Sequence, residues 1–450
     1  MGERNEGIVR RSAGAWWETT CRAPVLIFAG QRDRGATKMN LRERFHEVMH
    51  FNTNVRTIKW EFGYWGETIN KWYDQGLPRR KPPAIPRNPS TPTSHLYSLA
   101  WNSLGGARLP KGIAVIGGGL YWPTQGMPLD NDVRESFGLD KAQIMTNVNL
   151  LFCPMFEQVK IAEDENYFDY IDSDGVTRRF MKNDQTMPSG LDYPIKDRKT
   201  WEKLKRERLN LEKIKDRFPK NWVSLVKSYK NRDYPLALGG YPHGLFGTLA
   251  DLMGYETLFL TYHDDPGLIH DIQKTFTELW IAVFSEVLQY TSIDHMHFWE
   301  DISYGSGCMV SNDVMREFML PYYKRITDFL RSKGVDIILL DTDGYCMDII
   351  DLFLEGGITG MYPFERHCGM DIVEVRKKYP HLQIMGGIPK EDIRKGEKRI
   401  EEILEPAKAV LKTGGYIPHA DHLIPPENDY ASFSYYRRRL NELIESAGKI

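Results

Sequence analysis

The sequence has few of the features that mark secreted, membrane-spanning or nucleic-acid-binding proteins. Its five cysteines are scattered, odd in number and without a CxxC pair, which argues against a disulfide framework and predicts a cytoplasmic protein. No apolar run approaches the roughly 18 residues of a membrane span. The net charge is only -2, so the protein has no overall positive electrostatic field that would attract a polyanion. We therefore expect no nucleic-acid partner and no membrane partner.

The chain changes character near residue 39. Residues 1–38 contain an apolar piece that is too short for a signal sequence with the usual flanks, and we interpret them as an appended or weakly ordered extension. From Asn40, a suitable N-cap, the residues Leu41, Phe45 and Val48 follow at helical spacing. The folded domain is expected to cover residues 39–450.

Short apolar runs alternate with amphipathic helices through most of this domain. The expected helices include residues 271–290, 312–333, 346–354 and 398–412. Eight such strand and helix units, without an early glycine-rich dinucleotide fingerprint, favour an α/β fold of the (β/α)8 TIM-barrel type. The eight expected strands are residues 56–65, 112–119, 236–240, 293–299, 335–340, 358–363, 382–386 and 414–418.

Residues 156–180 follow a different pattern, because they alternate as two strands about Asp172-Ser173-Asp174-Gly175. This pattern predicts an antiparallel β-hairpin inserted in the barrel. The two aspartates and the glycine also resemble the start of a calcium loop. No glutamate closes the twelve-residue frame, so a plain turn is the favoured interpretation.

Carboxylates stand where a buried strand ends, at Asp341 and Asp343 before Gly344. Acids in such a place are costly to hold unless they bind something. The carboxyl ends of barrel strands face one common mouth, where chemistry is located. Polar residues that follow other strands are therefore expected to converge with these two acids, namely His295, His297, Glu300, Asp301, Glu365, His367, Cys368, His419, Asp421 and His422.

Imidazole with two or three carboxylates can hold Zn²⁺, or Mn²⁺ and Fe²⁺ where oxygen dominates. An open position on such an ion acts as a Lewis acid. Each residue also has a structural interpretation: Asp341 and Asp343 can cap a helix, Glu365 can pair with Arg366, and a histidine can belong to the core. The chain has no HExxH, HxC or CxxC motif, so spacing alone does not define a metal site.

Many short pieces occur in a particular order between residue 39 and the C-terminus. In that order they resemble the uroporphyrinogen decarboxylase superfamily, which implies a (β/α)8 barrel independently of the strand count. The pieces are Tyr64-Trp65 with Thr68 and Trp72, Glu300-Asp301, Glu317-Phe318 with Pro321-Tyr322, Asp341-Thr342-Asp343-Gly344, Pro363-Phe364-Glu365, Gly369-Met370-Asp371, Gly386-Gly387-Ile388, and Gly414 to Pro418 with Asp421-His422.

Departures from this superfamily narrow what the resemblance implies. True decarboxylases carry Gln-Ala-Gly-Arg-Tyr near the N-terminus, where this chain has Glu61-Phe62-Gly63-Tyr64-Trp65. The thiol-methylating, cobalamin-dependent methyltransferases use a His-x-Cys pair and a late cysteine, where this chain has Asp341-x-Asp343 and residues 419–422. The chain is more similar to the O-demethylase methyltransferases of methoxylated aromatic compounds.

The resemblance and the strand ends together imply a metal-assisted methyltransferase. It would move a methyl group from a small methoxylated, aromatic substrate to the Co(I) corrinoid of a partner protein, with zinc as the metal. A decarboxylase of a smaller acid and a non-catalytic corrinoid-binding protein stay open as alternatives, as does a homodimer. The expected catalytic residues are Asp343, Glu365, His422 and Asp341; the metal ligands Asp343, Glu365, His422, His419 and Asp421; and the substrate-binding residues Tyr64, Trp65, Tyr241, His297, Trp299, Glu300 and Asp301.

Overall fold

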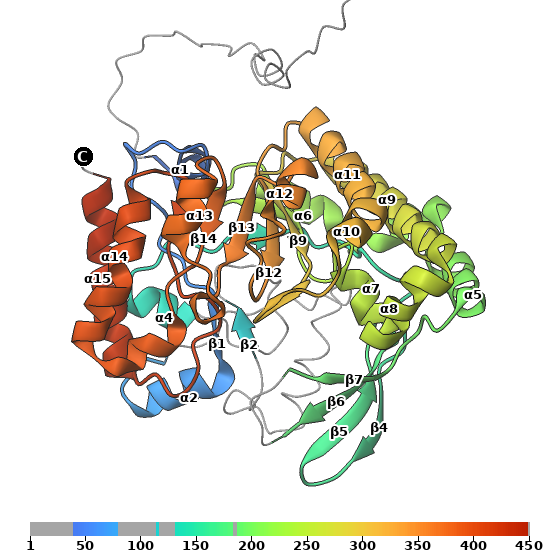
Figure 1. Ribbon diagram of the computed structural model, residues 1–450, viewed down its shortest axis with the longest axis horizontal. Helices are drawn as coiled ribbons and strands as arrows, with labels where there is room; N and C mark the ends of the chain where they lie inside the picture. The colour runs from blue at the N-terminus through green and yellow to red at the C-terminus, as the bar shows by residue number, and fades with distance from the viewer. Residues whose placement is uncertain (1–38, 80–113, 117–130, 183–186, 449–450) are drawn as a thin grey trace, which may run out of the picture. The chain divides into compact units, whose positions relative to one another are not determined.

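The computed structural model describes residues 39–79, 114–116, 131–182 and 187–448, and a curled sheet of seven parallel strands lies at the centre (Figure 1). The expected extension over residues 1–38 lies outside the described residues. The sheet order β15-β14-β13-β12-β9-β8-β3 is that of a (β/α)8 barrel, as the sequence predicts. The strands are β3 (Ile144–Met145), β8 (Leu236–Gly239), β9 (His295–Trp299), β12 (Ile338–Thr342), β13 (Gly360–Pro363), β14 (Gln383–Met385) and β15 (Tyr416–Ile417).

An extended segment, residues 57–62, occupies the gap between the two edge strands. The Thr57 hydroxyl donates to the carbonyl of Tyr416 in β15 at 2.5 Å. On the other side, the indole of Trp60 donates to the carbonyl of Lys141 at 2.8 Å, just before β3. The segment is therefore hydrogen-bonded to β15 on one side and to the residues just before β3 on the other.

The structure corrects two of the eight expected strands. Residues 56–65 contribute to the ring through 57–62, but β1 (Gly63–Trp65) then pairs antiparallel with β2 (Ala114–Ile116). The expected strand 112–119 is therefore not a barrel strand. Its place in the ring belongs to β3, which is only two residues long and so shows no periodicity in the sequence.

Helices cover the outer face of the sheet (Figure 1). The predicted helix at 271–290 is confirmed as α9, whereas the one at 312–333 divides at Met319 into two helices. Pro321 lies in the first turn of the second helix, where its missing N–H is tolerated. No described helix has the length and hydropathy of a bilayer-crossing segment. The helices are α1 (Leu41–Met49), α2 (Gly66–Asp74), α4 (Asn131–Ser136), α5 (Arg198–Arg208), η1 (Leu211–Arg217), α6 (Trp222–Tyr229), α7 (Gly247–Met253), α8 (Tyr255–Asp264), α9 (Pro266–Leu288), α10 (Asn312–Phe318), α11 (Leu320–Ser332), α12 (Ile350–Glu355), η2 (Arg366–Cys368), α13 (Ile372–Lys378), η3 (Lys390–Lys395), α14 (Glu397–Leu411) and α15 (Tyr430–Ala447).

Helix α1 lies at the end of the barrel where the strands begin, opposite the inserted sheet (Figure 1). Its Phe45 ring packs at 4.7 Å from His295 and at 5.8 Å from Trp60, measured between ring centroids. Phe45 and Trp60 belong to a small cluster with Ile337 and Leu339 of the barrel interior, separate from the main core under the outer helices. The alternation along β12 therefore directs its odd-numbered side chains into the barrel.

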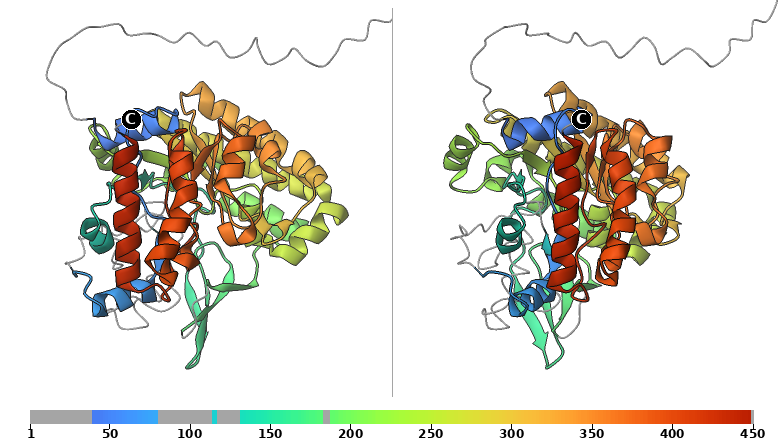
Figure 2. Two further views of the ribbon diagram at one scale, coloured as in Figure 1. Left: turned by 60° about the vertical axis from the view of Figure 1, so that its left-hand side comes forward. Right: turned by 90° about the vertical axis from the view of Figure 1, so that its left-hand side faces the viewer.

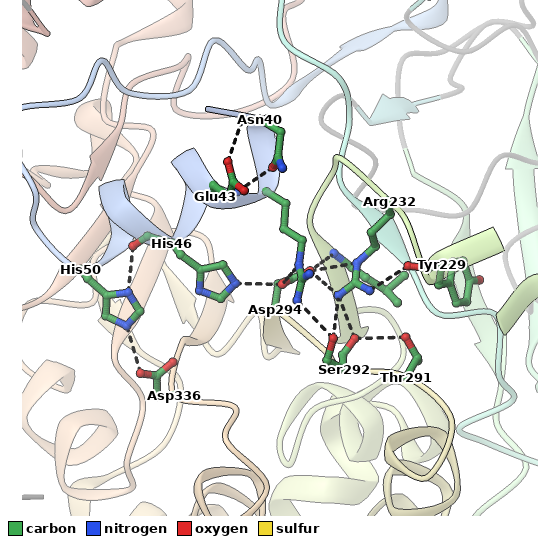
Figure 3. Close-up of polar contacts among 12 residues, drawn as sticks. Asn40, Glu43, His46, His50, Tyr229, Arg232, Thr291, Ser292, Asp294 and Asp336 are labelled. Carbon is green, nitrogen blue, oxygen red and sulfur yellow. Dashed lines mark hydrogen bonds and ion pairs between the residues drawn. The ribbon is translucent and has the colours of Figure 1, made fainter. Parts of the chain in front are cut away.

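A buried acid attaches α1 to the start of β9 (Figure 3). The Asp294 carboxylate accepts hydrogen bonds from Arg42 at 2.6 Å and from His46 at 2.8 Å. It also pairs with Arg232 at 2.8 Å, and neither side chain of that pair is more than 2% exposed. Nearby, Asp336 accepts from His50 at 3.0 Å, but both side chains are about half exposed. These contacts hold α1 against the start of β9.

The inserted hairpin is present and is part of a larger antiparallel sheet (Figure 2). Strands β5 (Tyr167–Ile171) and β6 (Thr177–Met181) form the hairpin, flanked by β4 (Val159–Glu163) and β7 (Ser189–Asp192). Asp172 accepts from the backbone N–H groups of Asp174 and Val176, which supports the plain-turn interpretation. Arg178 of β6 pairs with Asp251 of α7 at 2.7 Å and so attaches the sheet to the barrel.

Candidate active site

Three carboxylates meet at the carboxyl end of β12. Asp341 is the fourth residue of that strand and points into the barrel, because it continues the alternation of Ile337 and Leu339. One oxygen each of Asp301, Asp341 and Asp343 lies within 4.8 Å of the other two. We call these three residues the carboxylate cluster.

Two members of the carboxylate cluster, Asp301 and Asp341, have no directly paired cation among the described residues, and His422 attracts Asp301 without a hydrogen bond or ion pair between them. The Asp341 residue is only 8% exposed. Neither its carboxylate nor that of Asp301 has a hydrogen-bond or ion-pair partner among the described residues. Burial and the neighbouring acids raise the pKa of both groups well above the ordinary aspartate value. An acid buried in this way calls for a proton or a cation.

The third member, Asp343, is paired. Its carboxylate lies 3.3 Å from the imidazole of His422, which comes from the loop after β15. Burial opposes the charge on both groups, but their mutual attraction outweighs it, so the pKa of Asp343 is lowered and that of His422 is raised. The Phe62 ring stacks on His422 with centroids 4.9 Å apart and so fixes the imidazole plane.

Backbone strain and a buried anchor set the position of Asp301. Its φ of 44° lies in the left-handed region, which aspartate tolerates at a cost of about 1–3 kcal/mol when the surroundings impose it. The preceding Glu300 is fully buried and accepts from the N–H groups of Leu245, Phe246 and Gly247 at 2.6–3.0 Å. Glu300 thus holds the loop after β8 and orients its neighbour, rather than facing the mouth itself.

Glu365, at the end of β13, lies beside the carboxylate cluster. One of its oxygens pairs with Lys390 at 3.1 Å and the other accepts from the N–H of Gly344 at 3.0 Å. Lys390, which starts the short helix η3 after β14, is not among the residues predicted from the sequence. Its place two residues beyond the strand-ending Gly386-Gly387-Ile388 segment is the only feature that points to it.

Two predicted metal ligands are engaged elsewhere. The Asp421 carboxylate accepts from the backbone N–H groups of Arg366 and Lys390, at 2.8 and 3.0 Å, and so connects the loops after β13, β14 and β15. Burial raises its pKa to about 6. His419 is buried, and its Nδ1 lies 2.8 Å from the carbonyl of Ala420. Of the five predicted ligands, the structure brings Asp343, Glu365 and His422 together.

The predicted substrate-binding aromatics separate into two groups. Tyr241 and Trp299 pack edge to face, with centroids 4.7 Å apart, beside the strand ends β8 and β9. Trp65 is half-buried against the barrel interior. In contrast, Tyr64 lies in the main core against Trp72, away from the interior cluster. His297 is also buried and contacts the Tyr362 hydroxyl at 2.9 Å inside the barrel.

The protein is thus a barrel of parallel strands with an acid-lined site at the carboxyl ends of those strands. Three oxygens at this spacing suit a divalent cation that prefers oxygen ligands. His422 beside them adds one nitrogen at the edge of the site.

Comparison with known proteins finds similar solved structures but does not assign the chain to a protein family. No protein-family model matches the chain, and no curated protein does. A protein assigned as a vitamin-B12-independent methionine synthase from Listeria monocytogenes is similar over 49% of this chain and 69% of its own, with 13% identity and a TM-score of 0.29. A B12-independent methionine synthase from Shewanella sp. W3-18-1 is similar over 70% and 86%, with 11% identity and a TM-score of 0.33. A 3-keto-L-gulonate-6-phosphate decarboxylase from Vibrio cholerae is similar over 50% and 89%, with 14% identity and a TM-score of 0.21. The barrel assignment therefore rests on the strand order and register.

Proposed function

We propose that this protein is a cation-assisted methyltransferase that takes a methyl group from a small methoxylated substrate and delivers it to a corrinoid carried by a partner protein. The observation that carries the proposal is the carboxylate cluster, in which neither Asp301 nor the buried Asp341 has a directly paired cation among the described residues. A divalent cation held there would stabilise the negative charge that develops on the ether oxygen as the methyl group leaves.

The chain's own residues would act around that charge. Asp301, Asp341 and Asp343 would hold the cation. The imidazole of His422, which lies 3.3 Å from the Asp343 carboxylate, would orient that ligand and place a ring nitrogen beside the leaving oxygen. Lys390 fixes the Glu365 carboxylate at 3.1 Å, which keeps that acid at the edge of the cluster. The Tyr241 and Trp299 pair offers an apolar surface for a flat ring.

A decarboxylase of a small acid is the less favoured function. A carboxylate substrate requires a positive partner at the mouth. Among the described residues at this edge, Lys390 and His422 are already paired with Glu365 and Asp343. The charge around Asp341 is negative, so it would repel such a substrate.

Metal analysis and turnover test the proposal together. We expect the purified protein to bind one divalent cation at the carboxylate cluster and Asp341→Asn to weaken that binding at least tenfold, because it removes a buried ligand charge. His422→Ala should abolish methyl transfer from a methoxylated aromatic compound to a Co(I) corrinoid protein, followed by the corrinoid absorbance. Asp351→Asn, an exposed acid on α12, is the matched control and should change neither. Wild-type activity in both site variants would refute the proposed roles.

A further inference from the structure

A second group of ligating atoms lies on the short turn η2, directly after β13. One ligating atom each of Glu365, His367 and Cys368 lies within 4.8 Å of the other two. The Cys368 sulfur is 3.3 Å from Nε2 of His367 and 3.7 Å from Oε2 of Glu365. This set contains a thiol, an imidazole and a carboxylate, whereas the carboxylate cluster offers oxygen alone.

These distances match the edges of a tetrahedral zinc site. Bond lengths of about 2.3 Å to sulfur and about 2.0–2.1 Å to nitrogen or oxygen place neighbouring ligand atoms about 3.5 Å apart. Both measured distances from the Cys368 sulfur lie within a few tenths of an ångström of that value. The Cys368 sulfur thus already lies at the distances from His367 and Glu365 that one small ion would impose.

The turn backbone holds these side chains on one side. The N–H of Cys368 donates to the carbonyl of Glu365 at 3.2 Å, and the turn closes at Gly369, whose φ is 92°. Phe364, just before the turn, has a φ of 60°, so the chain enters it in a strained conformation. Arg366, the residue inside the set, pairs with Asp371 and keeps its own charge away from the ligands.

We propose that Glu365, His367 and Cys368 form a second metal site, selective for Zn²⁺ or a similar thiophilic divalent ion and distinct from the carboxylate cluster. His367 is exposed, which gives the ion a path from solvent. On binding, the Cys368 thiol loses its proton to solvent as the sulfur–metal bond forms, while His367 and Glu365 donate a lone pair each. Three protein ligands leave a fourth position for water or substrate, which is the pattern of a catalytic rather than a structural zinc site.

Cobalt substitution tests this site without any activity assay. Co²⁺ added to the metal-stripped full-length protein should produce a thiolate-to-cobalt charge-transfer band in the near ultraviolet. Cys368→Ser should abolish the band, and His367→Ala should weaken Co²⁺ binding at this site at least tenfold. Cys153→Ser, in a half-buried thiol that contacts the Asp216 carbonyl, is the matched control and should leave the band unchanged. Because His367 and Cys368 lie on a surface turn, circular dichroism should show both variants folded.

The Asp341→Asn variant separates this proposal from the proposed function. If the two sites are distinct, the band persists in Asp341→Asn while binding at the carboxylate cluster is weakened. A band that survives in Cys368→Ser, or stoichiometric Co²⁺ binding without any band, would overturn the second site and leave the carboxylate cluster untouched. Loss of the band in Asp341→Asn would instead show that the two groups hold one shared ion.

Discussion

The buried acid at the start of β9 allows a quantitative test of how α1 is attached. We expect Asp294→Ala to lower the free energy of unfolding by about 3–5 kcal/mol, because removing one member of a buried pair leaves the other charge uncompensated. The remaining charge is that of Arg232, whose side chain is only 2% exposed. The substitution also removes the acceptor for the N–H of Leu236, at 2.8 Å. The measurement is urea-induced unfolding followed by tryptophan fluorescence.

Asp336 provides the matched control at the same end of the barrel (Figure 3). It also accepts a hydrogen bond from a histidine of α1, but its side chain is 60% exposed and that of His50 is 49% exposed. Asp336→Ala should therefore cost no more than about 1 kcal/mol, the range of solvent-exposed ion pairs. Equal losses in the Asp294 and Asp336 variants would refute the reasoning, since burial is the difference between them.

The pH dependence of the free energy of unfolding gives a second test of the role of Asp294. Burial opposes the charge on Asp294, but bonds from His46, Arg42 and Leu236 outweigh it, so its folded pKa lies below the unfolded value of about 3.9. A lowered folded pKa means that the stabilisation is complete above the unfolded pKa and is lost as the pH falls below it. The unfolding free energy of Asp294→Asn should therefore decline less than that of the parent between about pH 5 and pH 3.

Two further substitutions test the inserted sheet and the anchor of Asp301. Arg178→Met should cost about 3–5 kcal/mol, because it removes the only cation that pairs with the largely buried Asp172 and Asp251 among the described residues. It should also expose strands β4 to β6 to limited proteolysis, while Arg179→Met on the opposite face should not. Glu300→Ala should weaken divalent-cation binding in a calorimetric titration and destabilise the fold by at least about 2 kcal/mol, because it orphans three buried N–H groups. Unchanged cation affinity would show that Asp301 does not depend on this anchor.

The sequence predicted most of the ring because most barrel strands are long enough to show a pattern. The uninterrupted apolar run from Ile337 to Leu340, most of which forms β12, indicates a strand buried on both faces. In contrast, β3 contains two residues, and its place is set by parallel pairing with β8 rather than by its own composition. The antiparallel pairing of β1 with β2 is likewise set by tertiary contacts, and no local sequence pattern indicates it.

The sequence predicts that the site lies at the carboxyl ends of the strands, but it does not predict the direction in which each side chain points. Asp341 and Asp343 were identified because acids at the end of a buried strand are costly. The segment containing His419, Asp421 and His422 shows what spacing cannot provide. The chain bends at Asp421 and His422, so that His422 meets Asp343 while Asp421 binds backbone N–H groups of two neighbouring loops. Only the three-dimensional arrangement separates these roles.

The balance of charge around Asp341 is the physical reason for a cation at this mouth. Three other carboxylates act on Asp341, namely Asp301, Asp343 and Glu365. Lys390 compensates Glu365 and His422 compensates Asp343, through contacts of 3.1 and 3.3 Å. Two acids, Asp301 and Asp341, are left without a positive partner among the described residues. A single divalent ion supplies the charge that these two acids lack, whereas an anionic substrate would increase the imbalance.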